Sequence, residues 1–134
     1  MTSLIIGISL GVFTILLFEM LKGFDKAVVY GLILTGIGFL YVGYTWSDLA
    51  SLIINITQAV IFLGLAYYGV KKSITILAVG YLLHGIWDFG YELLNQPDLL
   101  PPHYDLFCLS VDFTIGLYLL LFARHIKSKY KTSI

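Results

Sequence analysis

Long apolar stretches separated by short polar segments make up most of the chain. Each stretch holds about 20 mostly apolar residues, the length that an α-helix needs to cross the hydrocarbon of a bilayer. The expected spans cover residues 3–21, 27–46, 49–70, 74–94 and 104–123. The pattern predicts an all-α polytopic membrane protein, a single bundle domain over residues 1–134 with five transmembrane helices.

The connecting segments contain residues that cap or interrupt helices. Ser47-Asp48 is a tight polar turn whose side chains can cap the helix that follows. Lys71-Lys72-Ser73 has the same place before the fourth span. The segment after that span contains Pro97, Pro101 and Pro102. Proline lacks an N–H and disfavours helix in the residue before it, so we expect the fourth and fifth helices to separate there.

All eight Lys and Arg residues fall on one side of the expected membrane. They lie in the first loop, the third loop and the C-terminal tail: Lys22, Lys26, Lys71, Lys72, Arg124, Lys127, Lys129 and Lys131. Because positively charged loops stay in the cytoplasm, this distribution predicts an outside N-terminus and a cytoplasmic C-terminus. We expect a multi-pass protein of the cell (inner) membrane.

Composition agrees with the spans and narrows the function classes. Hydrophobic residues make up 59% and charged residues 12% of the chain, whereas soluble domains carry about 25% charged residues. A small soluble domain has too much surface to hide so many apolar side chains, so we expect the lipid bilayer as the partner. The net charge of zero predicts no nucleic-acid partner. A single cysteine, Cys108, allows no intramolecular disulfide.

Polar side chains gather at one depth of the expected bundle, toward its outer face. On the fourth span, His84, Asp88 and Glu92 follow one another at every fourth position and share a helix face. Cys108 and Asp112 share a face of the fifth span. The second and third spans add further polar residues at a similar depth: Tyr41, Tyr44, Asn55 and Gln58. At about 1.5 Å per residue, His84 and Asp112 both fall near the middle of the membrane.

Ionisable groups at this depth point to a working site. Placing a carboxylate inside a bilayer costs about 2.5–3.5 kcal/mol on insertion scales. Because of this cost, such a residue is by default interpreted as part of a functional site. We expect His84, Asp88 and Asp112 to be catalytic, with one aspartate abstracting or delivering a proton and His84 as its partner. They would lie in a polar pocket that opens outward. The expected ligand-binding residues are Tyr41, Tyr44, Asn55, Gln58, Tyr81, Trp87, Tyr91, Glu92 and Cys108.

The same residues allow other interpretations. His84, Asp88 and Asp112 could bind a metal ion, but zinc prefers three or four N, S or O ligands and the core holds one histidine. We therefore expect no metal and no other cofactor. The polar residues could instead form a hydrogen-bond network that only fixes the helix packing. Gly7-x-x-x-Gly11 permits close approach of another helix, which leaves a homo-oligomer open.

The segment Leu82-Leu83-His84-Gly85-Ile86-Trp87-Asp88, with Asp112 on the next helix, resembles a family of small prokaryotic membrane proteins of unknown function. That family carries His-x-x-Trp-Asp on one helix and Asp on the next, and the match covers the last third of the chain. Its pattern has a histidine or two just after the aspartate, where this chain has Tyr91-Glu92. The resemblance implies no established activity. In architecture alone, a small bundle with an acid-and-histidine pocket is similar to sterol isomerase-type membrane domains.

Three function hypotheses remain open at this point. The leading one is a pocket for a small lipophilic or amphipathic ligand, with acid–base chemistry of an isomerase or hydrolase type. The second is a proton-coupled carrier or permeation subunit that acts as an oligomer, because carboxylates at mid-membrane relay protons in such proteins. The third is a structural or accessory membrane subunit. The sequence leaves open whether the protein is an enzyme.

Overall fold

A computed structural model of the chain describes residues 2–94 and 103–123. The described part is all-helical, and each of its five helices is long and apolar enough to cross a membrane. The helices are α1 (Thr2–Met20), α2 (Lys26–Tyr44), α3 (Leu49–Lys71), α4 (Ile74–Leu94) and α5 (Tyr104–Leu121). They begin and end within two residues of the stretches expected from the apolar pattern. The prediction of an all-α chain with five membrane-length helices is confirmed at this level.

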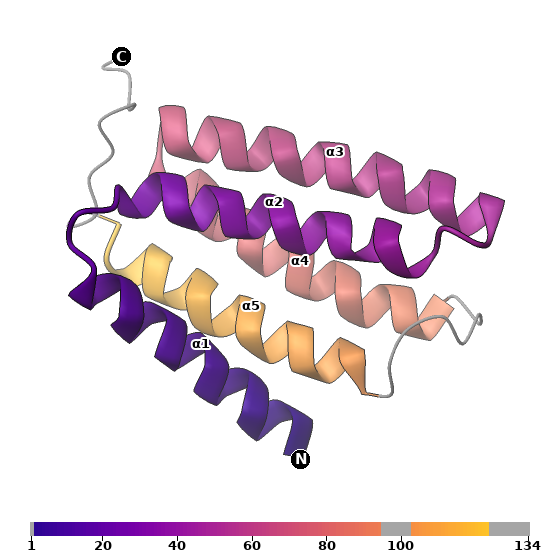
Figure 1. The fold of residues 1–134 in the computed structure, drawn as a ribbon, viewed down its shortest axis with the longest axis horizontal. Coiled ribbons are helices and arrows are strands. Elements are labelled where there is room, and N and C mark those ends of the chain that lie inside the picture. The colour runs from indigo at the N-terminus through magenta and orange to yellow at the C-terminus, as the bar shows by residue number, and fades with distance from the viewer. Residues whose placement is uncertain (1, 95–102, 124–134) are drawn as a thin grey trace.

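The helices pack into an elongated bundle with α4 at its centre (Figure 1). Helix α4 contacts α5, α3 and α2, while α2 and α3 form a second close pair. Helix α1 lies at the edge and packs mainly against α5. Half of the α4 span is buried (50%), against 11% of the α1 span. Helix α4 therefore has the most buried of the five described spans.

Short side-chain caps begin several helices. Asp25 Oδ1 accepts hydrogen bonds from the backbone N–H groups of Ala27 at 3.1 Å and Val28 at 3.3 Å. Asp48 caps α3 by accepting from the Ser51 N–H at 3.1 Å, and the Ser51 hydroxyl and N–H lower the pKa of this exposed carboxyl. Such caps satisfy backbone donors that a helix start leaves without intrahelical partners. The turn at residues 47–48 thus reverses the chain as the sequence suggests.

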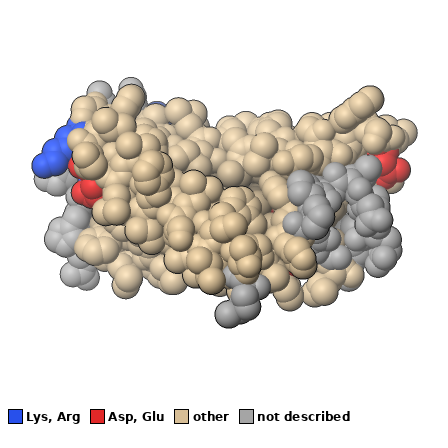
Figure 2. Space-filling model, turned by 60° about the horizontal axis from the view of Figure 1, so that its bottom comes forward, with Lys and Arg blue, Asp and Glu red and all other residues tan. Residues whose placement is uncertain are grey.

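The exposed charged side chains on the face in Figure 2 lie near the ends of the bundle. Figure 2 shows blue basic atoms at one end, red acidic atoms near both ends, and an uncharged band between them on the face in view. We call the end that carries Lys22, Lys26, Lys71 and Lys72 the lysine end. The basic tail residues Arg124, Lys127, Lys129 and Lys131, and the prolines of the fourth loop, lie outside the described residues.

A polar contact ties α1 to its neighbours at the lysine end. The Glu19 carboxylate accepts hydrogen bonds from Lys26 Nζ at 2.7 Å and from the Tyr118 hydroxyl. The Phe18 ring packs edge-on against Tyr30, with ring centres 6.0 Å apart. Together these contacts join α1, α2 and α5 at the lysine end.

Small residues allow α1 to approach α5 closely. A Cβ atom placed on Gly7 would lie 1.8 Å from Ser110 Oγ and 2.6 Å from the Phe107 carbonyl oxygen. One placed on Gly11 would lie 2.8 Å from two Thr114 side-chain carbons. The Gly-x-x-x-Gly pair of α1 therefore packs within the chain, against the serine and threonine that are four residues apart on α5.

We predict that Gly7→Ala destabilises the bundle by about 1–3 kcal/mol, because the added methyl overpacks the contact with α5. Gly36→Ala is the matched control, since a Cβ at that helical glycine meets nothing within 4 Å. Thermal unfolding in detergent measures both. Equal effects of the two substitutions would contradict the α1–α5 packing.

Candidate functional site

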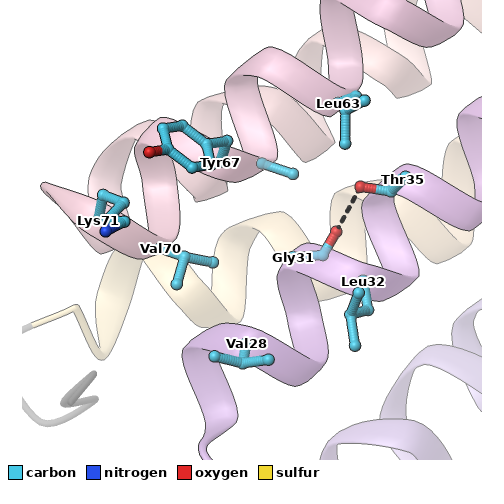
Figure 3. A pocket seen from close by; sticks show the side chains of 9 residues that line it. Val28, Gly31, Leu32, Thr35, Leu63, Tyr67, Val70 and Lys71 are labelled. Atoms are coloured by element: carbon cyan, nitrogen blue, oxygen red, sulfur yellow. Dashed lines mark hydrogen bonds between the residues drawn. The ribbon is translucent and has the colours of Figure 1, made fainter. Parts of the chain in front are cut away.

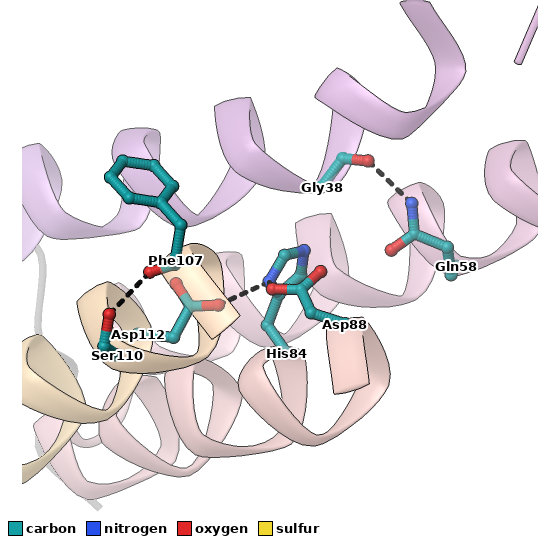
Figure 4. A network of polar contacts seen from close by, with 7 residues as sticks. All are labelled: Gly38, Gln58, His84, Asp88, Phe107, Ser110 and Asp112. Carbon is teal, nitrogen blue, oxygen red and sulfur yellow. Dashed lines mark hydrogen bonds and ion pairs between the residues drawn. The ribbon is translucent and has the colours of Figure 1, made fainter. Parts of the chain in front are cut away.

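Helices α4 and α5 bring His84 and Asp112 into direct contact. His84 Nδ1 lies 2.7 Å from Asp112 Oδ2, and the two side chains are 1% and 2% exposed (Figure 4). Which atom donates depends on the His84 tautomer: if Asp112 is ionised it can only accept a hydrogen bond, and Nδ1 then carries the proton. A charge-assisted bond of this kind is shorter and stronger than a neutral one. It joins two residues that are 28 positions apart in the sequence.

Glycines beside both residues permit this contact. A Cβ on Gly85, next to His84, would lie 2.9 Å from ring carbons of Phe113, next to Asp112. On α5, a Cβ on Gly116 would lie 2.9 Å from Leu82 Cδ2. Each glycine thus leaves room for a large side chain of the facing helix. The short His84–Asp112 distance follows from this close packing.

Asp88 completes the group from one turn further along α4. Its Oδ2 lies 3.2 Å from the same His84 Nδ1, but neither Asp88 oxygen has a hydrogen-bond partner among the described residues. The Asp88 side chain is fully buried. Tyr41 of α2 is also fully buried and interacts electrostatically with Asp88. Asp88 therefore has the His84 ring and Tyr41 as polar neighbours.

The second nitrogen of His84 faces α2 and α3. Figure 4 draws it on the side of Gly38 and Gln58, away from Asp112. This Nε2 atom is buried and has no hydrogen-bond partner in the described structure. The Phe62 ring lies edge-on to the imidazole with ring centres 4.8 Å apart, and the Tyr41 ring lies 6.3 Å away. The imidazole is thus packed against two aromatic rings, while its Nε2 atom has no hydrogen-bond partner among the described residues.

Amide side chains of α3 bridge the neighbouring helices. Asn55 Nδ2 donates to Thr45 Oγ1 at 3.1 Å and to the Tyr91 hydroxyl at 3.2 Å, joining α3 to the end of α2 and to α4. Gln58 Nε2 donates to the Gly38 carbonyl oxygen at 2.6 Å. The oxygens of both amides remain without a partner among the described residues. Polar residues of α2, α3, α4 and α5 therefore do face one another.

Aromatic rings cover the side of this group away from the lysine end. Tyr41, Tyr91, Tyr104 and Cys108 form a buried cluster, with Trp87 packed against it. The Tyr41 ring lies 5.1 Å from the Tyr91 ring and 5.7 Å from the Tyr104 ring, both edge-on. We call this set the tyrosine cluster. It separates Asp88 and His84 from the end of the bundle that lies opposite the lysines.

Three of the expected ligand-binding residues lie elsewhere or are not described. The Tyr81 hydroxyl donates to the Tyr30 carbonyl oxygen at 2.5 Å, so its polar atom is engaged toward the lysine end. Tyr44 is 36% exposed and lies at the rim of the tyrosine cluster. Its ring centre is 5.4 Å from that of Tyr104. The Glu92 side chain lies outside the described part of the structure.

Phe62, Tyr104 and Thr45 belong to the neighbourhood but were not among the expected site residues. Phe62 follows Gln58 by four positions on α3 and so shares its face, a signal that the sequence does contain. Tyr104 stands four positions before Cys108 on α5. Thr45 comes after the last residue of α2, and its burial depends on how the chain turns there.

The number of unbonded polar atoms sets this region apart from the apolar core. They are Tyr41 Oη, Asn55 Oδ1, Gln58 Oε1, His84 Nε2, Trp87 Nε1 and both Asp88 oxygens. Each buried polar group without a partner costs about 1–3 kcal/mol, and a charged group costs more. Donors and acceptors both occur in the set. A small polar molecule, or the polar end of a larger one, would satisfy several of them at once.

A metal ion is a weaker fit to the same three residues. One ligand atom each of His84, Asp88 and Asp112 lies within 4.8 Å of the other two, which is a workable size for an ion site. Two tetrahedral zinc ligands at about 2.0 Å from the metal are roughly 3.3 Å apart. The 2.7 Å between His84 Nδ1 and Asp112 Oδ2 is instead a hydrogen-bond distance. The expectation of no metal stays a prediction.

We predict unequal losses of stability when the two aspartates are neutralised. Asp112→Asn breaks the 2.7 Å contact with His84 and should cost about 1.5–3 kcal/mol. Asp88→Asn weakens only the longer 3.2 Å contact with the same nitrogen, so it should cost less. Unfolding in a denaturing detergent measures the difference between these isosteric variants. Equal destabilisation by both would indicate that the carboxylates serve the packing alone.

Comparison with known proteins places the chain in a family without assigning it an activity. A model of a family of unknown function (DUF6010) matches residues 2–125, far more than the last third on which the resemblance in the sequence was based. The His-x-x-Trp-Asp pattern stays a prediction. No curated protein and no solved structure matches the chain. The match covers nearly the whole bundle, and the chain therefore belongs to this family, DUF6010, whose function is unknown.

Proposed function

We propose that the protein is a multi-pass membrane protein with an acid–base site in the outer half of its bundle. In this proposal the site binds a small lipophilic or amphipathic molecule and moves a proton on it. One observation carries the proposal: Asp112 holds one nitrogen of a buried imidazole at 2.7 Å while the other nitrogen has no hydrogen-bond partner among the described residues.

That arrangement suits a general acid or base. A carboxylate bonded to one imidazole nitrogen fixes the tautomer and orientation of the ring, and the opposite nitrogen then exchanges a proton with the reacting molecule. Asp112 is the positioning residue in this scheme, and His84 Nε2 is the reacting atom. This sharpens the sequence-based hypothesis, in which an aspartate moved the proton and histidine assisted it.

Asp88 supplies a second acidic position beside the same ring. Its Oδ2 lies 3.2 Å from Nδ1, so an ionised Asp88 would stabilise the positive charge that His84 gains when Nε2 takes a proton from the bound molecule. A proton-shift isomerase can use one base for both steps, because Nε2 can remove a proton from one atom of the molecule and return it to another. A hydrolase would use the same base to activate water.

The surrounding residues support an amphipathic ligand. Gln58 Oε1 and Asn55 Oδ1 are unbonded acceptors, while Tyr41 Oη and Trp87 Nε1 can donate. Rings of the tyrosine cluster and Phe62 offer apolar walls for the rest of the molecule. A mostly apolar site with few oriented polar groups is typical of small-molecule binding.

We propose the orientation that the lysines suggest, with the lysine end in the cytoplasm and the N-terminus outside the inner membrane. The acid–base group would then face the outer leaflet. A homo-oligomer is compatible with this proposal, although the Gly-x-x-x-Gly pair of α1 packs on α5.

Proton transfer without a bound substrate is the second candidate function. It is favoured by the burial of the group: His84 and Asp112 are 1% exposed and Asp88 is not exposed at all. A proton, unlike an organic ligand, can reach such residues with little movement of the packing. Mid-membrane carboxylates serve as relays in pumps and transporters. A structural role, the third hypothesis, predicts that neutralising the aspartates changes stability alone.

The proposal predicts that the protein exchanges hydrogen between water and one specific lipid-soluble molecule. Proteoliposomes made with the lipid extract of the expressing cells are incubated in D₂O or in H₂¹⁸O and analysed by mass spectrometry. An isomerase adds deuterium to its substrate, and a hydrolase adds ¹⁸O to its product. His84→Asn should lower the labelling rate by about 10²–10⁴-fold, the usual contribution of general acid–base catalysis.

His103→Asn is the matched control, because this exposed histidine stands at the N-cap position of α5, without a side-chain cap, at a φ of 59° that asparagine tolerates. It should label at the wild-type rate. Labelling that is the same in both variants, or absent from the wild type, would contradict the acid–base proposal. The protein would then be placed in liposomes without added substrate. A proton flux that the wild type and His103→Asn support and His84→Asn does not would favour the proton relay.

A further inference from the structure

One side of the bundle is closed by side chains rather than by helix packing. In the described part of the chain, the helices pack against one another in the order α1, α5, α4, α3 and α2 (Figure 1). Helices α2 and α5 both contact α4, but they are not among the described pairs that pack closely against each other. A ligand of the buried acid–base group could therefore pass between α2 and α5 without separating two packed helices.

Aromatic rings fill this side of the bundle at the end opposite the lysines. Tyr44, the last residue of α2, and Tyr104, the first residue of α5, lie edge-on with ring centres 5.4 Å apart. The Tyr104 ring lies edge-on to Tyr41 at 5.7 Å. The Tyr41 ring in turn lies edge-on to the His84 imidazole at 6.3 Å. The rings thus form a continuous series from the ends of two helices to the acid–base group.

Exposure falls along this series from the surface inward. Tyr44 is 36% exposed and Tyr104 is 8% exposed. Tyr41 and His84 are buried almost completely, at 0% and 1%. The surface beside Tyr44 is apolar, because Leu40, one turn earlier on the same helix face, is 45% exposed. The series therefore begins at a surface that suits lipid and ends at buried polar atoms.

The outermost ring of the series is held weakly. Among the described residues, the Tyr44 hydroxyl has no hydrogen-bond partner, and its ring packs edge-on against Tyr104. An edge-on pair of rings contributes little beyond the area it buries. The seam between α4 and α5 is instead fixed by the 2.7 Å contact of His84 with Asp112. Movement of the Tyr44 ring therefore costs less than separation of α4 from α5.

We propose that the ligand of the acid–base group enters from the lipid between α2 and α5, and that the Tyr44–Tyr104 ring pair is the gate. The inference rests on the proposed function and deepens it by naming the source of the substrate. Such a gate admits a molecule dissolved in the leaflet opposite the lysine end and excludes a charged, water-soluble one. Tyr44 then belongs to the entry path, in keeping with its place at the rim of the tyrosine cluster.

The single cysteine of the chain reports on this gate. Cys108 belongs to the tyrosine cluster and interacts electrostatically with Tyr104 and Asp88, so a reagent that reaches it has passed the gate. Two methanethiosulfonates of similar size are compared in proteoliposomes by intact mass. The benzyl reagent is neutral and lipid-soluble, and the trimethylammonium-ethyl reagent is a cation confined to water. Asp105, in the first turn of α5, attracts a cation, so slow reaction of the charged reagent would not reflect repulsion.

Removing the outer ring should open the path to the neutral reagent alone. Tyr44→Ala should raise its rate of reaction about two- to tenfold, the usual weight of one edge-on ring pair, and leave the rate of the cation unchanged. Tyr44→Phe should react at the wild-type rate, because the ring rather than the hydroxyl closes the path. Tyr68→Ala is the matched control and should also react at the wild-type rate. Tyr68 is exposed and lies edge-on to Tyr67 at 5.6 Å, but at the lysine end.

The same rate in Tyr44→Ala and Tyr68→Ala would overturn the proposal, and so would the same increase in Tyr44→Ala and Tyr44→Phe. An equal increase with the cation would also overturn it, because the path would then lead to water. The reaction at Cys108 needs no turnover. A negative result here therefore leaves the deuterium labelling of His84→Asn as a separate test of the acid–base proposal.

Discussion

The contact between His84 and Asp112 is the interaction around which the described bundle is organised. It lies at the seam of α4 and α5, the two helices that pack most closely, and it is buried almost completely. A buried charge–imidazole pair is tolerated only when geometry and neighbouring groups compensate for lost solvation. Gly85 and Gly116 supply that geometry by letting the two helices approach. The remaining polar contacts are arranged about this seam.

The two halves of the bundle differ in what they bury. Toward the lysine end the core is mostly apolar, built from residues such as Leu34, Phe62, Leu77 and Leu119. Its tyrosines are satisfied in part, as when Tyr81 donates to the Tyr30 carbonyl oxygen. In the other half, several buried donors and acceptors have no hydrogen-bond partner among the described residues.

The five helices were predictable because their apolar runs are continuous and end at polar turns. The meeting of His84 with Asp112 was partly predictable as well, since depth follows from the direction of each span. The sequence could not show how each helix is rotated about its axis, because packing against neighbours sets that rotation. For this reason Tyr81 was expected beside the site although its hydroxyl turns to Tyr30. Phe62 was not expected, although its ring lies 4.8 Å from His84.

An apolar groove between α2 and α3 near the lysine end illustrates the same limit (Figure 3). Gly31 and Ala66 look like ordinary small residues of a membrane helix until the facing side chains are known. Hydropathy treats all lipid-facing positions alike, so it cannot distinguish a flat surface from a hollow one. The position of Lys71 at the end of the hollow likewise depends on where α3 ends against α2.

The central claim is that Asp112 holds Nδ1 of His84 so that Nε2 is free to exchange a proton. Solid-state ¹⁵N NMR of histidine-labelled protein in lipid, with His84→Asn to assign the signals, tests it most directly. The account predicts that Nδ1 stays protonated across the pH range while Nε2 gains or loses its proton. A neutral ring with the proton on Nε2 and a bare Nδ1 would contradict it.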